Sequence, residues 1–209
     1  RKDEILPYIE RLRDETRVPI IYVSHSIAEV ARLATTMVLL SDGRVDAAGP
    51  VTEIMSRLDL YPKTGRFEGG AVLETSVAAH DGRFGLTRLA LGDAVITVPR
   101  IDLPVGAPVR VRIRARDVIV AVQPPQGLSA LNVLAGRVAE VAPGTGSSRN
   151  IRIELAAGSL VARVTERSEV ELGLVPGRAV FAIVKSVALD RHSLSGAPPD
   201  ARDDDGFDA

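Results

Sequence analysis

A long series of short apolar segments, running from about residue 66 to residue 190, constrains the fold more than any other feature of this sequence. Gly, Pro and Asp separate these segments at short intervals, which is typical of β-strands joined by tight turns. Many short strands at this spacing predict small β-barrels. We expect strands at residues 72–77, 84–91, 94–98, 109–113, 118–122, 132–141, 150–155, 160–164 and 179–186.

The β-rich region contains an internal repeat. Residues 103–114 read LPVGAPVRVRIR, and residues 174–185 read LVPGRAVFAIVK. The two segments align Gly106 with Gly177 and Arg114 with Lys185. We interpret them as equivalent parts of two tandem barrels of one type. The alternative is that turn–strand patterns of this kind recur by chance in β proteins.

The first 58 residues have a different pattern, in which helical and strand-like segments alternate as in an α/β layer. We expect an amphipathic helix at residues 1–16 and a strand buried on both faces at residues 18–23. Ser26 is a suitable N-cap for the next helix, and Glu29 completes a capping box. The layer then continues with a strand at 37–40, a turn at Asp42-Gly43, a return strand at 44–48 and a helix at 50–58.

Composition and charge exclude several classes of protein. The formal net charge is −1 and aromatic residues make up 3%, so we expect no nucleic-acid partner. The chain has no Cys, which excludes disulfides and thiolate metal sites, and we expect no metal site of another kind. No apolar run approaches the roughly 20 residues of a membrane-spanning helix. The sequence shows no signal peptide and does not begin with Met, so we expect it to belong to a longer gene product.

Four arginines, at positions 110, 112, 114 and 116, alternate with other residues. Because successive side chains of a strand point to opposite faces, the four should share one face. A basic face of this kind could bind an anion or a nucleic acid. We favour the other interpretation, in which the arginines form the solvated side of a barrel strand and Val109, Val111 and Ile113 point inward.

The α/β part carries a specific resemblance. Residues 20–30 (IIYVSHSIAEV) resemble the switch region of ABC-transporter ATPases, and residues 37–45 (MVLLSDGRV) and 48–54 (AGPVTEI) are similar to the segments that follow it in those proteins. The resemblance implies that His25 is the switch histidine that contacts the γ-phosphate of ATP, a role that suits imidazole. The alternative is a histidine that merely ends a strand.

The β-rich part resembles the accessory domains of the same family. Residues 112–118 (RIRARDV) are similar to a motif in the barrels of these ATPases, and residues 129–138 (SALNVLAGRV) resemble the opening of a molybdate-binding (Mop) domain. Segments 164–168 (VTERS), 172–177 (LGLVPG) and 183–186 (IVKS) complete that pattern. The implied fold is an α/β remnant of a P-loop ABC ATPase domain followed by all-β tandem OB-like (TOBE/Mop) barrels. Its expected parts are an ATPase portion at 1–62, a first barrel at 66–123, a Mop barrel at 127–190 and a disordered acidic tail at 195–209.

The Mop resemblance implies an oxyanion site. A tetrahedral dianion prefers many hydrogen-bond donors and little full charge. The implied donors are Ser129, the N–H of Ala130, Lys185 and Ser186, and Asn132 and Thr165 would position the loop. The alternative is that Ser129 and Asn132 are ordinary turn residues and Lys185 a solvated edge residue. Leu131 stands where the family often has a basic residue, which removes one potential contact to the anion.

The order of these segments resembles the ATP-binding subunit of bacterial molybdate ABC importers. The alternatives are an ABC ATPase subunit for another substrate, such as a sugar or a polyamine, with purely structural barrels, or a passive molybdate-binding protein. Whether the chain is an enzyme is left open: a longer parent would use ATP and Mg²⁺, but this sequence lacks the Walker A, signature and Walker B motifs and should be inactive alone. The resemblance implies a homodimer of ATPase subunits, transmembrane permease subunits, molybdate or tungstate as ligand, and a peripheral location on the cytoplasmic side of the inner membrane.

Overall fold

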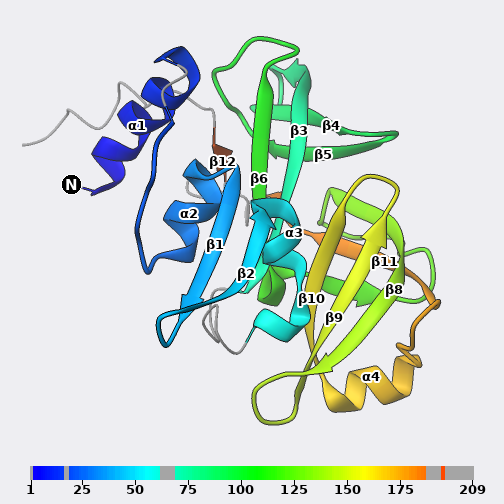
Figure 1. The fold of residues 1–209 in the computed structure, drawn as a ribbon. Coiled ribbons are helices and arrows are strands. Elements are labelled where there is room, and N and C mark those ends of the chain that lie inside the picture. Colours follow the sequence, from blue (N-terminus) through cyan, green and yellow to red (C-terminus); the bar gives the residue numbers. More distant parts are fainter. Residues whose placement is uncertain (1, 17–18, 62–68, 187–193, 196–209) are drawn as a thin grey trace, which may run out of the picture.

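Helices and strands alternate at the N-terminal end and are followed by a part made mainly of strands, as shown in the computed structural model of the chain (Figure 1). The structure describes residues 2–16, 19–61, 69–186 and 194–195. Of the expected acidic tail, only Ser195 lies among them. The N-terminal elements are α1 (Lys2–Thr16), α2 (Ile27–Leu33), β1 (Thr36–Ser41), β2 (Arg44–Pro50), α3 (Val51–Ser56) and a 3₁₀ turn, η1 (Leu58–Leu60).

The predicted α/β layer is confirmed except at one strand. β1 and β2 form an antiparallel hairpin, and its turn residues Asp42 and Gly43 have φ values of 49° and 75°, as a two-residue hairpin turn requires. The strand expected at residues 18–23 is not formed in the part that is described, and Ile21 and Val23 are 94% and 91% exposed. No described strand pairs with this segment, and an extended segment without a paired neighbour is not a stable strand.

Two five-stranded antiparallel sheets make up the rest of the molecule, in the orders β12-β6-β3-β4-β5 and β10-β9-β8-β11-β7. The first sheet consists of β3 (Gly70–Asp81), β4 (Leu86–Leu91), β5 (Ala94–Pro99), β6 (Pro108–Arg114) and β12 (Leu194–Ser195). The second consists of β7 (Ile119–Ala121), β8 (Asn132–Pro143), β9 (Ser148–Leu155), β10 (Ser159–Thr165) and β11 (Ala179–Val184). A 3₁₀ turn, η2 (Ala115–Asp117), precedes β7, and helix α4 (Glu166–Leu172) joins β10 to β11.

The internal repeat is confirmed by matching hydrogen bonds. Gly106 and Gly177 have φ values of 87° and 89°, and their N–H groups donate to Val77 O at 2.8 Å and to Val138 O at 2.7 Å. A register shift follows both valines, between Val77 and Ala79 and between Val138 and Glu140. Strands β3 to β6 therefore correspond to β8 to β11, and α4 is an insertion in the second repeat.

Each repeat gives its last strand to the sheet of the other repeat. β7 follows the first repeat but pairs with β11, and β12 follows the second repeat but pairs with β6. The registers are equivalent, since Val120 pairs with Ala182 and Leu194 pairs with Val111. One hydrophobic cluster includes buried residues of both sheets. The two predicted barrels are thus two interlocked sheets around a common core.

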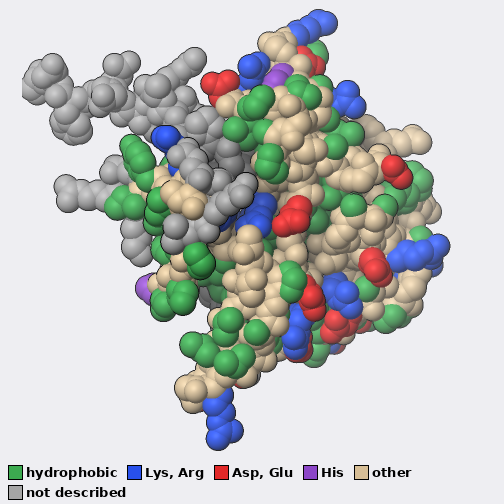
Figure 2. Space-filling model, turned by 45° about the horizontal axis from the view of Figure 1, so that its top comes forward, with side chains coloured by type: hydrophobic (Ala, Val, Ile, Leu, Met, Phe, Trp, Pro, Cys, Tyr) green, Lys and Arg blue, Asp and Glu red, His purple; other side chains and the backbone are tan. Residues whose placement is uncertain are grey.

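The arginines of β6 are not on a solvated face, contrary to our expectation. Arg112 is only 7% exposed, and Val72, its partner on β3, belongs to the small apolar cluster formed with Val51, Ile54 and Met55 of α3. The α/β layer covers this face of the sheet, which the alternation pattern of the strand could not reveal. On the molecular face shown in Figure 2, Lys and Arg are interspersed with Asp and Glu rather than gathered into one basic surface.

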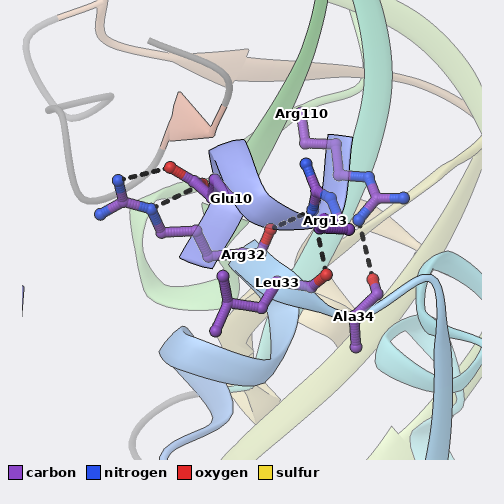
Figure 3. A network of polar contacts seen from close by, with 6 residues as sticks. All are labelled: Glu10, Arg13, Arg32, Leu33, Ala34 and Arg110. Atoms are coloured by element: carbon purple, nitrogen blue, oxygen red, sulfur yellow. Dashed lines mark hydrogen bonds and ion pairs between the residues drawn. The ribbon is translucent and has the colours of Figure 1, made fainter. Parts of the chain in front are cut away.

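Polar contacts of arginines join the layers around the end of α2 (Figure 3). Arg32 of α2 makes two 2.8 Å hydrogen bonds to Glu10 of α1, and Arg13 donates to Leu33 O at 3.0 Å. From β6, Arg110 donates to Ala34 O at 2.7 Å. The last carbonyl groups of a helix lack partners within the helix and carry partial negative charge, so guanidinium donors stabilise this end.

Candidate functional site

Five of the six residues predicted for the oxyanion site lie at one corner of the second sheet. Asn132, the first residue of β8, pairs with Val184, the last residue of β11. The residues just before β8 and just after β11 are therefore neighbours, since antiparallel partners begin and end at the same edge. Ser129 and Ala130 precede β8, Asn132 is its first residue, and Lys185 and Ser186 directly follow β11.

Asn132 holds this corner against the first repeat. Its side-chain oxygen accepts a hydrogen bond from the N–H of Thr97 on β5 at 2.6 Å, and its Nδ2 donates to Thr97 O at 3.0 Å. Nδ2 also donates to Oγ of Ser186 at 3.4 Å. Asn132 is 1% exposed and Ser186 is 7% exposed. Because its amide is buried and bonded within the protein, Asn132 orients the corner rather than presenting a donor to solvent.

The exposed groups at the corner are suited to an anion. Ser129 and Lys185 are exposed and Ala130 is half-buried, so a hydroxyl and an ammonium group are accessible on adjacent chain segments. Leu131 lies between them in sequence and is 56% exposed, where a basic side chain would have added a second charge. Within the described residues, no group of His, Cys, Asp and Glu is arranged to hold a metal ion.

Thr165 lies away from this corner within one chain. Thr165 pairs with Ser148, and the next residue, Arg149, pairs with Pro143. Pro143 is the last residue of β8, whereas Asn132 is its first. A strand of 12 residues spans on the order of 35 Å when straight, so these are opposite ends of the sheet. Thr165 is the N-cap of α4, and its Oγ1 accepts a hydrogen bond from Ser168 N at 3.1 Å.

At two positions, the corresponding corner of the first repeat has alanine where the second repeat has a polar residue. Ala71 pairs with Ile113 in the first sheet as Asn132 pairs with Val184 in the second. Ala115 lies two residues after Ile113, as Ser186 lies two residues after Val184. Both alanines are at most 1% exposed. The first repeat therefore lacks the polar side chains of the second at these two positions.

Tyr61 closes the corner of the first repeat. Its ring leaves no room for a Cβ at Gly69, its hydroxyl donates to Gly70 O at 3.2 Å, and it packs in one apolar cluster with Ala115 and Val161. Tyr61 is 5% exposed, and this burial raises the pKa of its phenol, so the ring is neutral. Among the described residues, Asn132 and Ser186 give the corner of the second repeat the polar side chains that Ala71 and Ala115 do not provide in the first.

His25 lies in the α/β layer, in the segment just before α2, and is exposed. Ser26 caps α2 as expected, accepting a hydrogen bond from Glu29 N at 3.4 Å. The N–H of Ser26 donates to Oγ of Ser24 at 3.1 Å, and the Glu29 carboxylate accepts from the hydroxyls of Ser24 at 2.7 Å and Tyr22 at 2.8 Å. The bond to Glu29 raises the pKa of Tyr22. These contacts tie the segment around His25 to α2.

The sequence did not predict one part of this corner, the main-chain N–H and C=O groups of Thr97. No side-chain motif marks them, because Asn132 contacts only the backbone of β5. A separate observation concerns membranes: none of the helices in the described ranges is both long and apolar enough to cross a bilayer.

Known proteins resemble the chain over nearly all of its length. Residues 128–190 match the TOBE domain model. The molybdenum import ATP-binding protein ModC of Mesorhizobium japonicum is 53% identical over 199 residues, which are 95% of this chain and 54% of that protein. ModC of Rhizobium etli is 50% identical over 190 residues, 91% of this chain and 53% of that protein. The chain thus spans about half the length of these relatives.

A solved structure supports the fold of the β-rich part. The cytoplasmic molybdate-binding protein ModG, in a crystal form with molybdate bound, superposes with a TM-score of 0.50 at 24% identity, covering 61% of this chain and 95% of that one. At this identity, the likeness supports an OB-type all-β architecture and nothing more specific. Residues 128–190 match the TOBE domain, and the chain is similar over 95% of its length to about half of the molybdenum import ATP-binding protein ModC.

Proposed function

We propose that this chain is the C-terminal part of the ATP-binding subunit of an ABC importer for molybdate, and that its second repeat binds the oxyanion. The observation that supports the proposal is the pairing of Asn132 with Val184, beside which Ser129, Ala130, Lys185 and Ser186 follow in sequence, in a chain whose relatives are named for molybdenum import. Several donors around a single positive charge suit a tetrahedral dianion.

The α/β layer would be the trailing part of a nucleotide-binding domain whose ATP and Mg²⁺ sites belong to the longer parent. In that parent, His25 would contact the γ-phosphate, and its exposure at the end of a segment fixed to α2 supports this role. Two such subunits would form a homodimer with transmembrane permease subunits, on the cytoplasmic side of the inner membrane. Thr165, at the far end of the second sheet, would then contribute to an anion site from another subunit or through α4, the helix that it caps.

Calorimetry with molybdate, tungstate, sulfate and spermidine tests the ligand. We expect heat of binding with molybdate or tungstate. Replacing Lys185 by Met should weaken that binding about tenfold or more, since a hydrogen bond to a charged group contributes about 1.5–3 kcal/mol. Arg114→Met is the matched control, because Arg114 occupies the equivalent position of the first repeat, where Tyr61 closes the corner.

Two outcomes would contradict this proposal. A folded chain that gives no heat with either metal oxyanion would favour an ATPase subunit for another substrate with structural barrels. Equal losses in Lys185→Met and Arg114→Met would show that the corner of the second repeat has no special role. For the nucleotide role, His25→Ala in the longer parent should reduce ATP hydrolysis while leaving molybdate binding by the β-sheets unchanged.

A further inference from the structure

A guanidinium group of the first sheet reaches the end of the helix that follows His25 (Figure 3). Arg110 of β6 donates from Nη1 to Ala34 O at 2.7 Å, and Ala34 is the C-cap of α2. The Arg110 side chain is only 18% exposed, and its Nη2 lies 3.5 Å from the carboxylate of Glu74, its partner on β3. The guanidinium is therefore fixed between the first sheet and α2.

Helix α2 is also held by α1 and by the apolar cluster that it shares with α3. Arg13 of α1 donates to Leu33 O at 3.0 Å. Ala31 is 2% exposed and belongs to the same cluster as Val72 of β3. The end of α2 is thus attached to α1 and to the first sheet, and Arg110 supplies its charged hydrogen bond from the sheet.

The other end of α2 carries His25. Ser26 is the N-cap of the helix, so His25 directly precedes the first turn. The hydroxyls of Tyr22 and Ser24, on the other side of His25, donate to the carboxylate of Glu29 within α2. Because both flanks of His25 are bonded to the helix, the histidine has to follow any movement of α2.

The helix is short enough to connect its two ends rigidly. It has 7 residues, which corresponds to a length of about 10 Å. A regular element of this kind passes a displacement at one end to the other. The contact of Arg110 with Ala34 therefore also determines where His25 lies relative to β6.

The second repeat has no such contact at the equivalent position. Phe181 pairs with Ala135 on the second sheet as Arg110 pairs with Glu74 on the first. The sheet architecture therefore forms without an arginine at this position. This comparison indicates that Arg110 serves the junction with the α/β layer rather than the sheet itself.

We propose that Arg110 is a positioning residue, which sets the place of His25 relative to the first sheet by holding α2. The inference rests on the proposed contact of His25 with the γ-phosphate of ATP. A displacement of β6 relative to the α/β layer would then move His25 and change the rate of ATP hydrolysis. The first sheet thus supports the nucleotide site, while the second carries the candidate anion corner.

NMR spectroscopy of the whole chain tests this effect in the folded state. Residual dipolar couplings of the α2 amides report the orientation of the helix relative to the first sheet, and the amide and ring signals of His25 report its surroundings. In Arg110→Met, we expect α2 to change its orientation and the His25 signals to shift. A contact that only stabilises the fold would leave both readouts unchanged when it is removed.

Three further variants make the result specific. Arg110→Lys keeps a charged donor for Ala34 O and should restore the wild-type signals in part. Arg114→Met is the matched control, because Arg114 lies on the same face of β6 but makes no bond to α2 among the described residues. Glu74→Gln serves if Arg110→Met does not fold: its side chain is 67% exposed, and loss of its charge should shift the His25 signals by a smaller amount.

ATP hydrolysis by the longer parent connects the position of His25 to the reaction. Arg110→Met should lower kcat about tenfold or more with little change in KM, because a small displacement of a catalytic group slows the chemical step strongly. Shifted His25 signals with an unchanged rate would support the positioning and contradict the contact of His25 with ATP. The positioning is overturned if α2 and His25 are unchanged in the folded Arg110→Met and Glu74→Gln variants, or if Arg114→Met has an equal effect.

Discussion

Arg110 lies where the α/β layer meets the first sheet. Its guanidinium donates to Ala34 O, just beyond the last residue of α2, and lies 3.5 Å from the Glu74 carboxylate. The side chain is only 18% exposed, so water replaces the carbonyl contact poorly when it is lost. The position therefore contributes to stability through one charged hydrogen bond between parts of the chain that are 76 residues apart.

Replacing Arg110 by Met should lower the free energy of unfolding by about 1.5–3 kcal/mol, the usual contribution of a hydrogen bond to a charged group. Denaturant unfolding followed by circular dichroism measures the change. Arg116→Met is the control, since Arg116 is 56% exposed and its ion pair with Asp117 is long, at 3.9 Å. It should change stability by less than about 0.5 kcal/mol. Equal effects of the two substitutions would contradict the assigned role of Arg110.

The arginine run also shows what sequence can predict for a single residue. The alternation of arginines with apolar residues correctly predicted that Arg110 and Arg112 share one face of a strand, because the two-residue period of a strand is a local property. What covers the face depends on α2 and α3, which precede it by more than fifty residues, and no local pattern carries that information. Solvation of these side chains was therefore the part of the prediction that failed.

At the scale of elements, the two glycines at the start of β6 and β11 make the repeat possible. Gly106 and Gly177 have φ near 90°, and in both cases a Cβ would meet no atom within 4 Å. A side chain at either position would therefore destabilise the protein by straining the backbone and not by colliding with neighbouring atoms. The equivalent hydrogen bonds to Val77 and Val138 fix where each strand begins.

Gly177→Ala should lower the free energy of unfolding by about 1–2 kcal/mol, because residues with a Cβ are strained at positive φ. Gly106→Ala should have a similar effect, since the turn is the same. Gly82→Ala provides the comparison, as that glycine also has open space around it but lacks a positive φ. Thermal and chemical unfolding of the three variants measure the difference, and a loss as large at Gly82 would disprove the conformational explanation.

Elements were predictable where local chemistry specifies them. The Asp42-Gly43 hairpin, the N-cap at Ser26 and the turns with Pro and Gly before β6 and β11 all follow from residues close in sequence. The strand at residues 18–23 was wrong because a strand depends on a neighbour to pair with. The exchange of β7 and β12 between sheets was not foreseen for the same reason, since pairing partners lie far apart in the chain.

At the scale of the whole molecule, the two repeats have the same architecture but different corners. The sequence motifs predicted the members of the candidate site, whereas the contact of Asn132 with the backbone of Thr97 follows from the packing of the two sheets. The same packing places Tyr61 over the first corner. The geometry of the site could therefore not be predicted from sequence where it depends on contacts between the two repeats.

The interlocked sheets should unfold as one cooperative unit. Leu89 of β4 and Ile153 of β9 occupy equivalent positions, both are 0% exposed, and both belong to the same apolar cluster. Each change to Ala should cost about 2–5 kcal/mol through lost apolar contact and a residual cavity. Because the repeats share a core and exchange strands, each variant should accelerate amide hydrogen exchange in β4 and in β9 alike.

Hydrogen exchange measured by mass spectrometry on Leu89→Ala and Ile153→Ala distinguishes this unit from two separate barrels. Val170→Ala, at a 73% exposed position on α4, should leave exchange in both sheets unchanged. If each core variant accelerates exchange only in its own repeat, the sheets are energetically independent. In that case Asn132 could not transmit a change at the anion corner to β5. Coupled exchange would mean that an anion bound at that corner stabilises both sheets, because its binding energy adds to the stability of the unit that unfolds.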